Sequence, residues 1–171
     1  AVSILEEWLA EEPADPIAQH MLAACTGRDV PARASNGFVE TTFDSFADSF
    51  ESKLEQLSYR APALVAEMLR ATTGEPSKSL DVLDAGCGTG LCGPLLSPHA
   101  SELIGVDLSG EMLKRAEPRQ LYDQLIKAEL TAFLQAQDQA HDLIVSADTL
   151  CYFGQLEAVS QAAQRALVPG G

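Results

Sequence analysis

The stretch that decides the fold reads Val82-Leu83-Asp84-Ala85-Gly86-Cys87-Gly88-Thr89-Gly90. Its apolar start predicts a buried strand. Its alternating glycines predict a tight turn into a helix, because glycine adopts backbone conformations that a Cβ forbids. A second acidic residue, Asp107, ends the next strand-like run, Leu103-Ile104-Gly105-Val106-Asp107. Parallel strands that end beside such a turn form a crevice at their carboxyl ends, and such crevices bind nucleosides.

The glycine spacing selects among nucleoside ligands. A dinucleotide fingerprint reads G-x-G-x-x-G, whereas Gly86, Gly88 and Gly90 follow G-x-G-x-G. Asp84 precedes the first glycine by two residues, where a carboxylate would repel a pyrophosphate but suit a ligand with an ammonium group. Asp107 can accept two hydrogen bonds from a ribose diol. The ligand indicated is S-adenosylmethionine, and the alternative is a purely structural strand-to-helix turn.

Residues 80–171 resemble the first half of a class I S-adenosylmethionine-dependent methyltransferase. The resemblance rests on five segments in the family's order. They are the glycine turn Leu83–Gly90, the ribose and adenine segment Val106–Ser109 with Met112, the acidic position in Ala128–Leu130, the fourth strand Asp142–Asp148, and the turn Leu167–Gly171. The resemblance implies an α/β fold, a Rossmann-like doubly wound parallel sheet, with S-adenosylmethionine as its cofactor.

The resemblance also implies which residues bind the cofactor. Asp107 would hold the ribose, and Glu129 would face the adenine amino group. The implied set is Asp84, Gly86, Cys87, Gly88, Gly90, Asp107, Leu108, Met112, Glu129, Leu130, Ser146 and Ala147. Within this set, Cys87 is the residue for which a small packing role in the turn is the simpler interpretation.

Strand-like and helix-like segments alternate from residue 79 onward, which predicts a parallel sheet with right-handed crossovers. Strands are expected at Ser79–Ala85, Glu102–Asp107, Gln124–Ala128 and His141–Ser146, and helices at Leu91–Leu96, Gly110–Ala116, Thr131–Ala136 and Leu156–Leu167. Asp84 and Asp107 would then end neighbouring strands. The sequence stops where a fifth strand is expected, so we expect a sheet truncated after strand four, with that strand as an exposed edge.

Residues 1–30 have a helical pattern. Apolar residues recur at helical spacing in Ile4–Leu9 and in Ile17–Cys25, and a turn at Glu12–Pro16 separates the two runs. The segment resembles the junction between tetratricopeptide-type helices, and a plain helical hairpin is the alternative. Since one such unit cannot bury its own face, either further repeats precede it or the hairpin docks on the main domain.

Residues 31–78 are expected to form N-terminal capping helices, before a cofactor-binding domain at residues 79–171. Thr41 with Asp44 matches a capping box. An apolar stripe then marks one helix face, at Phe43, Phe46, Phe50, Leu54 and Leu57. Core packing is the favoured interpretation of this stripe. In the other interpretation these helices cover the crevice, as in similar methyltransferases, with Tyr59 lining the pocket and Arg60 pairing with the methionine carboxylate.

The formal charge of −14 in 171 residues argues against a nucleic-acid groove, since phosphate contacts need a basic patch. A neutral or cationic small molecule, or a protein partner, is easier to accommodate. We find no apolar run of membrane-spanning length and no secretory signal, so we expect a cytoplasmic protein without a membrane span. The four cysteines and three histidines lack ligand spacing, and no metal site is expected.

Methyl transfer from a sulfonium is an in-line displacement, in which positioning contributes most and a base is optional. Asp148 and Tyr152 follow the fourth strand at the mouth of the crevice and are the candidate catalytic residues. Asp148 is expected to act as a base or as an amine-binding carboxylate, and the alternative is a helix cap. The sequence therefore predicts a methyltransferase acting on a small molecule or a protein side chain. Two functions stay open beside it: a catalytically silent cofactor-binding assembly or regulatory protein, and a nicotinamide-dependent oxidoreductase.

Overall fold

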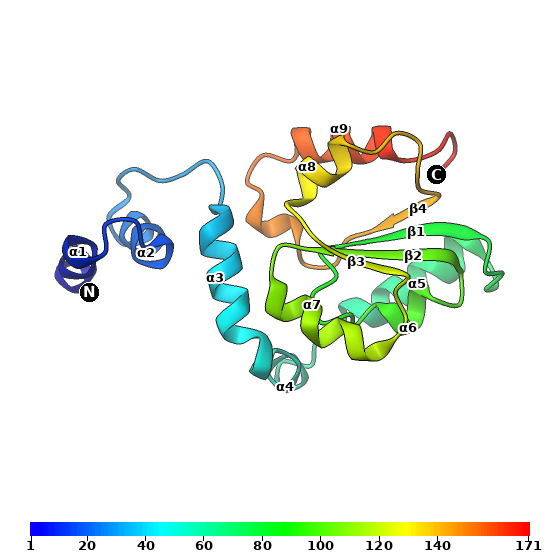
Figure 1. The fold of residues 1–171 in the computed structure, drawn as a ribbon, viewed down its shortest axis with the longest axis horizontal. Helices are drawn as coiled ribbons and strands as arrows, with labels where there is room; N and C mark the ends of the chain where they lie inside the picture. Colours follow the sequence, from blue (N-terminus) through cyan, green and yellow to red (C-terminus); the bar gives the residue numbers. More distant parts are fainter.

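The computed structural model describes residues 1–171 and contains one four-stranded sheet in the order β3-β2-β1-β4 (Figure 1). The strands are β1 (Leu80–Ala85), β2 (Ala100–Asp107), β3 (Gln124–Lys127) and β4 (Leu143–Val145). Each neighbouring pair is parallel, so the carboxyl ends of all four strands share one edge. The chain first builds outward from β1 through β2 to β3 and then returns to the other side of β1. This reversal of strand order leaves a crevice above the centre of the sheet.

Nine α-helices and three single-turn 3-10 helices accompany the sheet. The α-helices are α1 (Val2–Glu11), α2 (Pro16–Thr26), α3 (Asn36–Phe46), α4 (Phe50–Gln56), α5 (Ala61–Thr73), α6 (Gly93–Leu96), α7 (Gly110–Ala116), α8 (Leu130–Gln135) and α9 (Glu157–Ala166). The 3-10 helices are η1 (Ala47–Ser49), η2 (Glu117–Arg119) and η3 (Leu150–Tyr152).

Helices cover both faces of the sheet, and each face has its own apolar core. Leu83 and Val106 pack with α8 and α9 on one face, whereas Val82 and Leu103 pack with α5 and α6 on the other. Figure 1 shows α8 and α9 above the sheet and α5 and α6 below it. Two-sided cover explains why the strands read as nearly continuous apolar runs. The structure confirms the expected alternation of strands and helices in a doubly wound parallel sheet.

The N-terminal helices lie to one side of the sheet, with α3 between it and the hairpin of α1 and α2 (Figure 1). The hairpin meets α3 through the stacked rings of His20 and Phe38, whose centroids are 3.8 Å apart. Helix α3 and the turn after it dock on the sheet domain through charged pairs, Lys127 with Glu40 and Arg115 with Asp48. The predicted helical hairpin is present, and it packs on α3 rather than on the sheet.

The capping box expected at Thr41 was wrong. The helix starts earlier, at Asn36, and Ser35 caps it by accepting a hydrogen bond from the backbone N–H of Phe38 at 3.2 Å. Asp44 instead accepts a hydrogen bond from the Ser109 hydroxyl at 2.5 Å. The local pattern matched a cap, but the carboxylate is used in a long-range contact that tethers α3 to the start of α7.

Strand β4 lies at one edge of the sheet, as expected. After α9 the chain returns to it, because His141 and Leu167 form an isolated parallel bridge. The backbone N–H of Val168 donates to the carbonyl oxygen of His141 at 2.9 Å. Among the helices, none combines the length and the apolar character that crossing a membrane requires.

Candidate functional site

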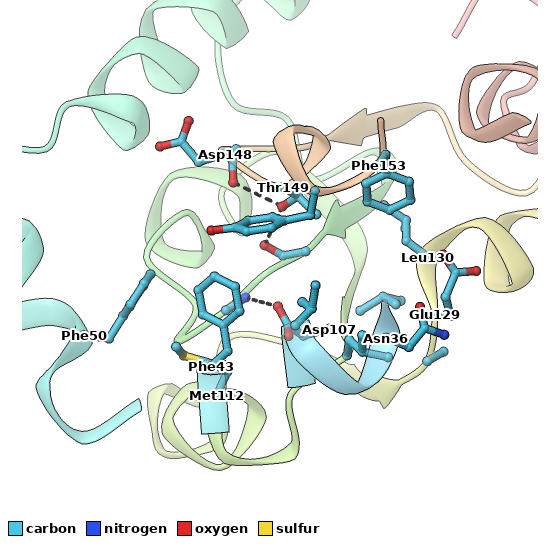
Figure 2. Close-up of a pocket in the computed structure, with 18 of the residues that line it drawn as sticks. Asn36, Phe43, Phe50, Asp107, Met112, Glu129, Leu130, Asp148, Thr149 and Phe153 are labelled. Carbon is cyan, nitrogen blue, oxygen red and sulfur yellow. Dashed lines mark hydrogen bonds between the residues drawn. The ribbon is translucent and has the colours of Figure 1, made fainter. Parts of the chain in front are cut away.

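A pocket opens at the carboxyl edge of the sheet, between the sheet and helices α3 and α4. Thirteen of its 21 lining residues are hydrophobic. Its walls come from the loop after β1, the end of β2, the connection between β3 and α8, the loop after β4, and the two covering helices. A mostly apolar pocket with a few polar groups is the usual form of a small-molecule site. Figure 2 shows Asp107 at its centre, with Phe43 and Phe50 to one side and Glu129 and Leu130 to the other.

Asp107 ends β2 and holds the glycine loop. Its Oδ2 accepts a hydrogen bond from the backbone N–H of Gly88 at 2.8 Å (Figure 2). Its Oδ1 accepts one from the backbone N–H of Ser109 at 2.8 Å. Burial raises the pKa of Asp107, and these backbone hydrogen bonds oppose that shift. Each oxygen keeps a second lone pair, so the carboxylate can still accept bonds from a ligand.

Gly88 has the open backbone position that a bound ligand needs. Its φ is +54°, and a Cβ built there would meet only the Phe50 ring, at 4.0 Å. Residues other than glycine rarely adopt such a φ. A larger side chain at position 88 would therefore be strained and would project into the space beside Asp107.

Glu129 lies at the opposite end of the pocket from Phe50. Its Oε2 accepts a hydrogen bond from the backbone N–H of Ala132 at 2.8 Å and caps α8. Its Oε1 is buried and has no hydrogen-bond partner. Leu108, Met112 and Leu130 add apolar walls at this level. The result is an apolar slot with one buried acceptor, which fits an aromatic heterocycle that carries an amino group.

The segment that connects α2 to α3, residues 27–35, covers this slot from outside and is called the strap below. The Nη1 of Arg33 lies 3.6 Å from the Oε1 of Glu129, beyond hydrogen-bond length, and its guanidinium stacks over the Phe153 ring at 5.6 Å. Arg33 also donates to the Oδ1 of Asn36 at 2.7 Å. Gly154 lies tightly against the carbonyl oxygen of Ala32, with no room for a Cβ. The strap thus joins the N-terminal helices to the loop after β4.

The other end of the pocket is aromatic. Phe43 stands nearly perpendicular to Tyr152, with ring centroids 5.4 Å apart, and to Phe50 at 6.2 Å. Tyr59 and Asp148 complete this end. Burial, followed by the neighbouring Asp148, raises the pKa of the Tyr59 phenol.

Eleven residues that the sequence indicated line the pocket: Tyr59, Gly86, Gly88, Asp107, Leu108, Met112, Glu129, Leu130, Ala147, Asp148 and Tyr152. Five others do not reach it. Arg60 is exposed at the start of α5, and the Ser146 hydroxyl donates to the Ala85 carbonyl at 2.9 Å. Cys87 is buried under the loop, and Asp84 and Gly90 face the core around Tyr122.

Asp84 is a buried structural carboxylate rather than a pocket residue. Its side chain is 1% exposed, and its Oδ2 accepts a hydrogen bond from the Tyr122 hydroxyl at 2.7 Å. Burial raises the pKa of Asp84 to about 6, despite that hydrogen bond. Asp84, for which the sequence suggested an ammonium contact, therefore lies outside the lining of the pocket.

Three pocket residues were not predicted from the sequence: Arg33, Asn36 and Val39, which lie before and in α3. Thr149 and Phe153 line the pocket within the segment after β4, Thr149–Phe153, that the sequence indicates as a pocket wall. The stripe that was favoured as core contributes Phe43, Phe50 and Leu54 to the pocket wall. Helical spacing had identified an apolar face correctly, but spacing does not reveal what the face covers.

Comparisons with known proteins agree with this geometry. A family model described as "Methyltransferase domain" matches residues 82–171. Human methyltransferase-like protein 27 is 37% identical over 84 residues, which cover 48% of this chain and 34% of that protein. The malonyl-[acyl-carrier protein] O-methyltransferase of Hamiltonella defensa is 30% identical over 141 residues, 81% of this chain and 54% of that protein. The chain thus spans about half the length, or less, of these curated relatives.

Solved structures share the fold. A DhpI–SAH complex superposes with a TM-score of 0.62 at 23% identity, covering 77% of this chain and 63% of that chain. At this identity the likeness concerns the arrangement of strands and helices.

Proposed function

The chain belongs to the class I S-adenosylmethionine-dependent methyltransferases, and we propose that it binds this cofactor in the pocket and methylates a small molecule or a protein side chain. One observation carries the proposal. Asp107 sits at the centre of the pocket, fixed by the Gly88 and Ser109 N–H groups, with lone pairs left for a ribose diol.

Three features support the fit between these residues and the cofactor. The space beside Gly88 is one that a Cβ would partly fill, so the backbone there admits a closely approaching ligand. The buried Oε1 of Glu129 lacks a hydrogen-bond partner, and the amino group of adenine is a donor. Leu108, Met112 and Leu130 offer the apolar contacts that a purine ring needs.

When bound, the cofactor supplies a methyl group on a positively charged sulfur. The chain's own contribution is to position both reactants and to exclude water, because in-line displacement depends mainly on alignment. The aromatic wall of Phe43, Phe50 and Tyr152 encloses the end of the pocket nearest the glycine loop. We propose Asp148 and Tyr152 as the residues that face the methyl acceptor there.

Isothermal titration with S-adenosylmethionine and, separately, with NAD tests the cofactor. We expect micromolar binding of the first and none of the second, and NAD binding alone would revive the oxidoreductase. Transfer of a labelled methyl group to a panel of acceptors then tests turnover. Binding without transfer to any acceptor would support the catalytically silent alternative, which no feature of the pocket favours.

We also propose that residues 1–30 form a tetratricopeptide-type unit and that residues 31–78 cap the pocket of the domain at 79–171. In addition, we propose that the hairpin of α1 and α2 contacts a protein partner. The support for this contact is the exposure of apolar side chains on the hairpin, including Ile4, Trp8 and Met21. Replacing Ile4 and Trp8 with serine should leave cofactor binding unchanged. A loss of cofactor affinity in that variant would instead tie the hairpin to the pocket.

A further inference from the structure

Aromatic side chains gather at the end of the pocket away from Glu129. Phe43 and Phe50 come from the covering helices, Tyr59 from the turn before α5, and Tyr152 from the loop after β4. Their rings are partly exposed, and the measured pairs meet edge to face, at 86° for Phe43 with Tyr152 and 73° for Phe43 with Phe50. The rings therefore form walls around a space rather than a closed stack. The faces of aromatic rings attract cations.

Asp148 contributes a carboxylate to the same space. None of the six ion pairs in the structure involves it. Its backbone φ is +53°, a left-handed conformation in which aspartate is one of the few tolerated side chains. In Figure 2 the Asp148 carboxylate lies at the upper left of the cavity, above Phe43 and Phe50. The neutral Tyr59 phenol neighbours Asp148, but no cationic side chain of the pocket does. A carboxylate without a cationic partner beside an apolar pocket favours a cationic ligand.

The charge balance of the whole pocket points the same way. Its lining contains three carboxylates, on Asp107, Glu129 and Asp148, and one cation, Arg33. Arg33 is already next to Glu129 at the far end. No cationic side chain lines the aromatic end, so a carboxylate or phosphate acceptor would find repulsion there and no partner.

We propose that the methyl acceptor is an amine, delivered as an ammonium cation that Asp148 and the rings of Phe43, Phe50 and Tyr152 hold at the aromatic end of the pocket. This inference rests on the proposed function and names the substrate class of the same site. It does not depend on whether the amine belongs to a free small molecule or to a side chain.

The reaction balances with a neutral amine as the nucleophile. The bound ammonium first loses one proton to the solvent, where buffer bases take it up, and the nitrogen lone pair becomes free. The nitrogen lone pair then forms a bond to the methyl carbon as the carbon–sulfur bond breaks. The electron pair of that bond stays on sulfur, which becomes a neutral thioether, and the product is a methylated ammonium. Asp148 therefore binds and orients the amine rather than acting as its base.

The test uses three probes of similar shape and different charge, titrated into the 171-residue chain saturated with S-adenosylhomocysteine. The probes are phenethylamine, 2-phenylethanol and 3-phenylpropanoate. Using the thioether product removes the sulfonium, so that the cofactor's cationic sulfur does not repel the amine probe. We expect phenethylamine to bind about tenfold more tightly than the alcohol, the scale of a cation held by aromatic rings and one carboxylate, and the propanoate to bind least.

Asp148→Asn should remove most of the preference for phenethylamine, because asparagine tolerates the same φ but lacks the charge. Glu157→Gln is the matched control, since it removes one exposed carboxylate at the start of α9, outside the pocket, and should keep the preference. Equal binding of the three probes, a preference for the propanoate, or equal behaviour of the two variants would overturn the amine assignment. Failure of S-adenosylhomocysteine itself to bind would instead overturn the proposed function.

Discussion

Two acidic residues at neighbouring strand ends, Asp107 and Asp84, occupy different regions of the molecule. Asp107 lies in the pocket, where it orders the glycine loop through the Gly88 N–H. Asp84 lies beneath the same loop, in the core between β1 and α6, where it accepts a hydrogen bond from the Tyr122 hydroxyl. The first carboxylate faces ligand space, and the second has its one strong partner inside the protein.

The difference follows from where each residue stands in its strand. Asp107 is the last residue of β2, so its side chain reaches the edge where the pocket opens. Asp84 precedes the end of β1 by one residue and shares a sheet face with Val82, which packs against α6. Side chains alternate between the faces of a strand, so one position decides whether an acid reaches the crevice or the core.

The second and third glycines of the loop, Gly88 and Gly90, extend this contrast and give the largest predicted effect. Gly88→Val should weaken S-adenosylmethionine binding by at least about 100-fold, because the side chain enters the pocket at a strained φ. Gly90→Ala should destabilise the fold by about 1–3 kcal/mol, since its Cβ would lie 3.0 Å from the Tyr122 ring. Titration calorimetry and urea unfolding of both variants measure the two effects. Retained binding in Gly88→Val would mean that the loop is only structural.

The sheet was predictable because its signals are local. Apolar runs, the glycine turn and Asp107 define the strands and the crevice within a few residues of sequence. The pocket wall formed by α3 and α4 was not predictable in this way, because Phe43 and Phe50 lie far in sequence from the glycine loop that they face. Asp44 shows the same limit, since its partner Ser109 is 65 residues away. For Asp84, the strand alternation with Val82 was present in the sequence and pointed to the core.

Asp84 should make the stability of the protein depend on pH. Its folded pKa of about 6 lies above the ordinary 3.8, so the folded state binds more protons than the unfolded state between these values. The free energy of unfolding should therefore fall as pH rises from about 4 to about 6, by up to about 3 kcal/mol from this group. Asp84→Asn should remove that fall, while the exposed Glu75→Gln should retain it. Urea unfolding at several pH values measures the free energy of unfolding of each variant. The same pH dependence in Asp84→Asn and in the parent protein would show that Asp84 is not its source.

Substituting alanine for each of the two acids in turn separates an effect on cofactor binding from an effect on folding stability. Asp107→Ala should weaken S-adenosylmethionine binding by about 1.5–3 kcal/mol, the scale of hydrogen bonds to a charged group. Asp84→Ala should leave the affinity of the folded protein nearly unchanged and should lower stability, because it leaves the Tyr122 hydroxyl buried without its acceptor. Titration calorimetry measures the cofactor affinity of both variants, and urea unfolding measures their stability. Unchanged affinity in Asp107→Ala would remove the ribose assignment.

Glu129 resembles Asp107 in combining backbone hydrogen bonding with a place in the pocket lining, and its predicted effect is the smallest. Glu129→Gln should weaken cofactor binding by about 1 kcal/mol, since the carbonyl that remains is a weaker acceptor for an amino group. The amide can still cap α8 through the Ala132 N–H, so stability should change little. Glu129→Ala should lose the cap as well, at about 1 kcal/mol of stability. If calorimetry shows parent-like affinity in both variants while urea unfolding shows the loss in Glu129→Ala, then Glu129 caps the helix and does not touch the cofactor.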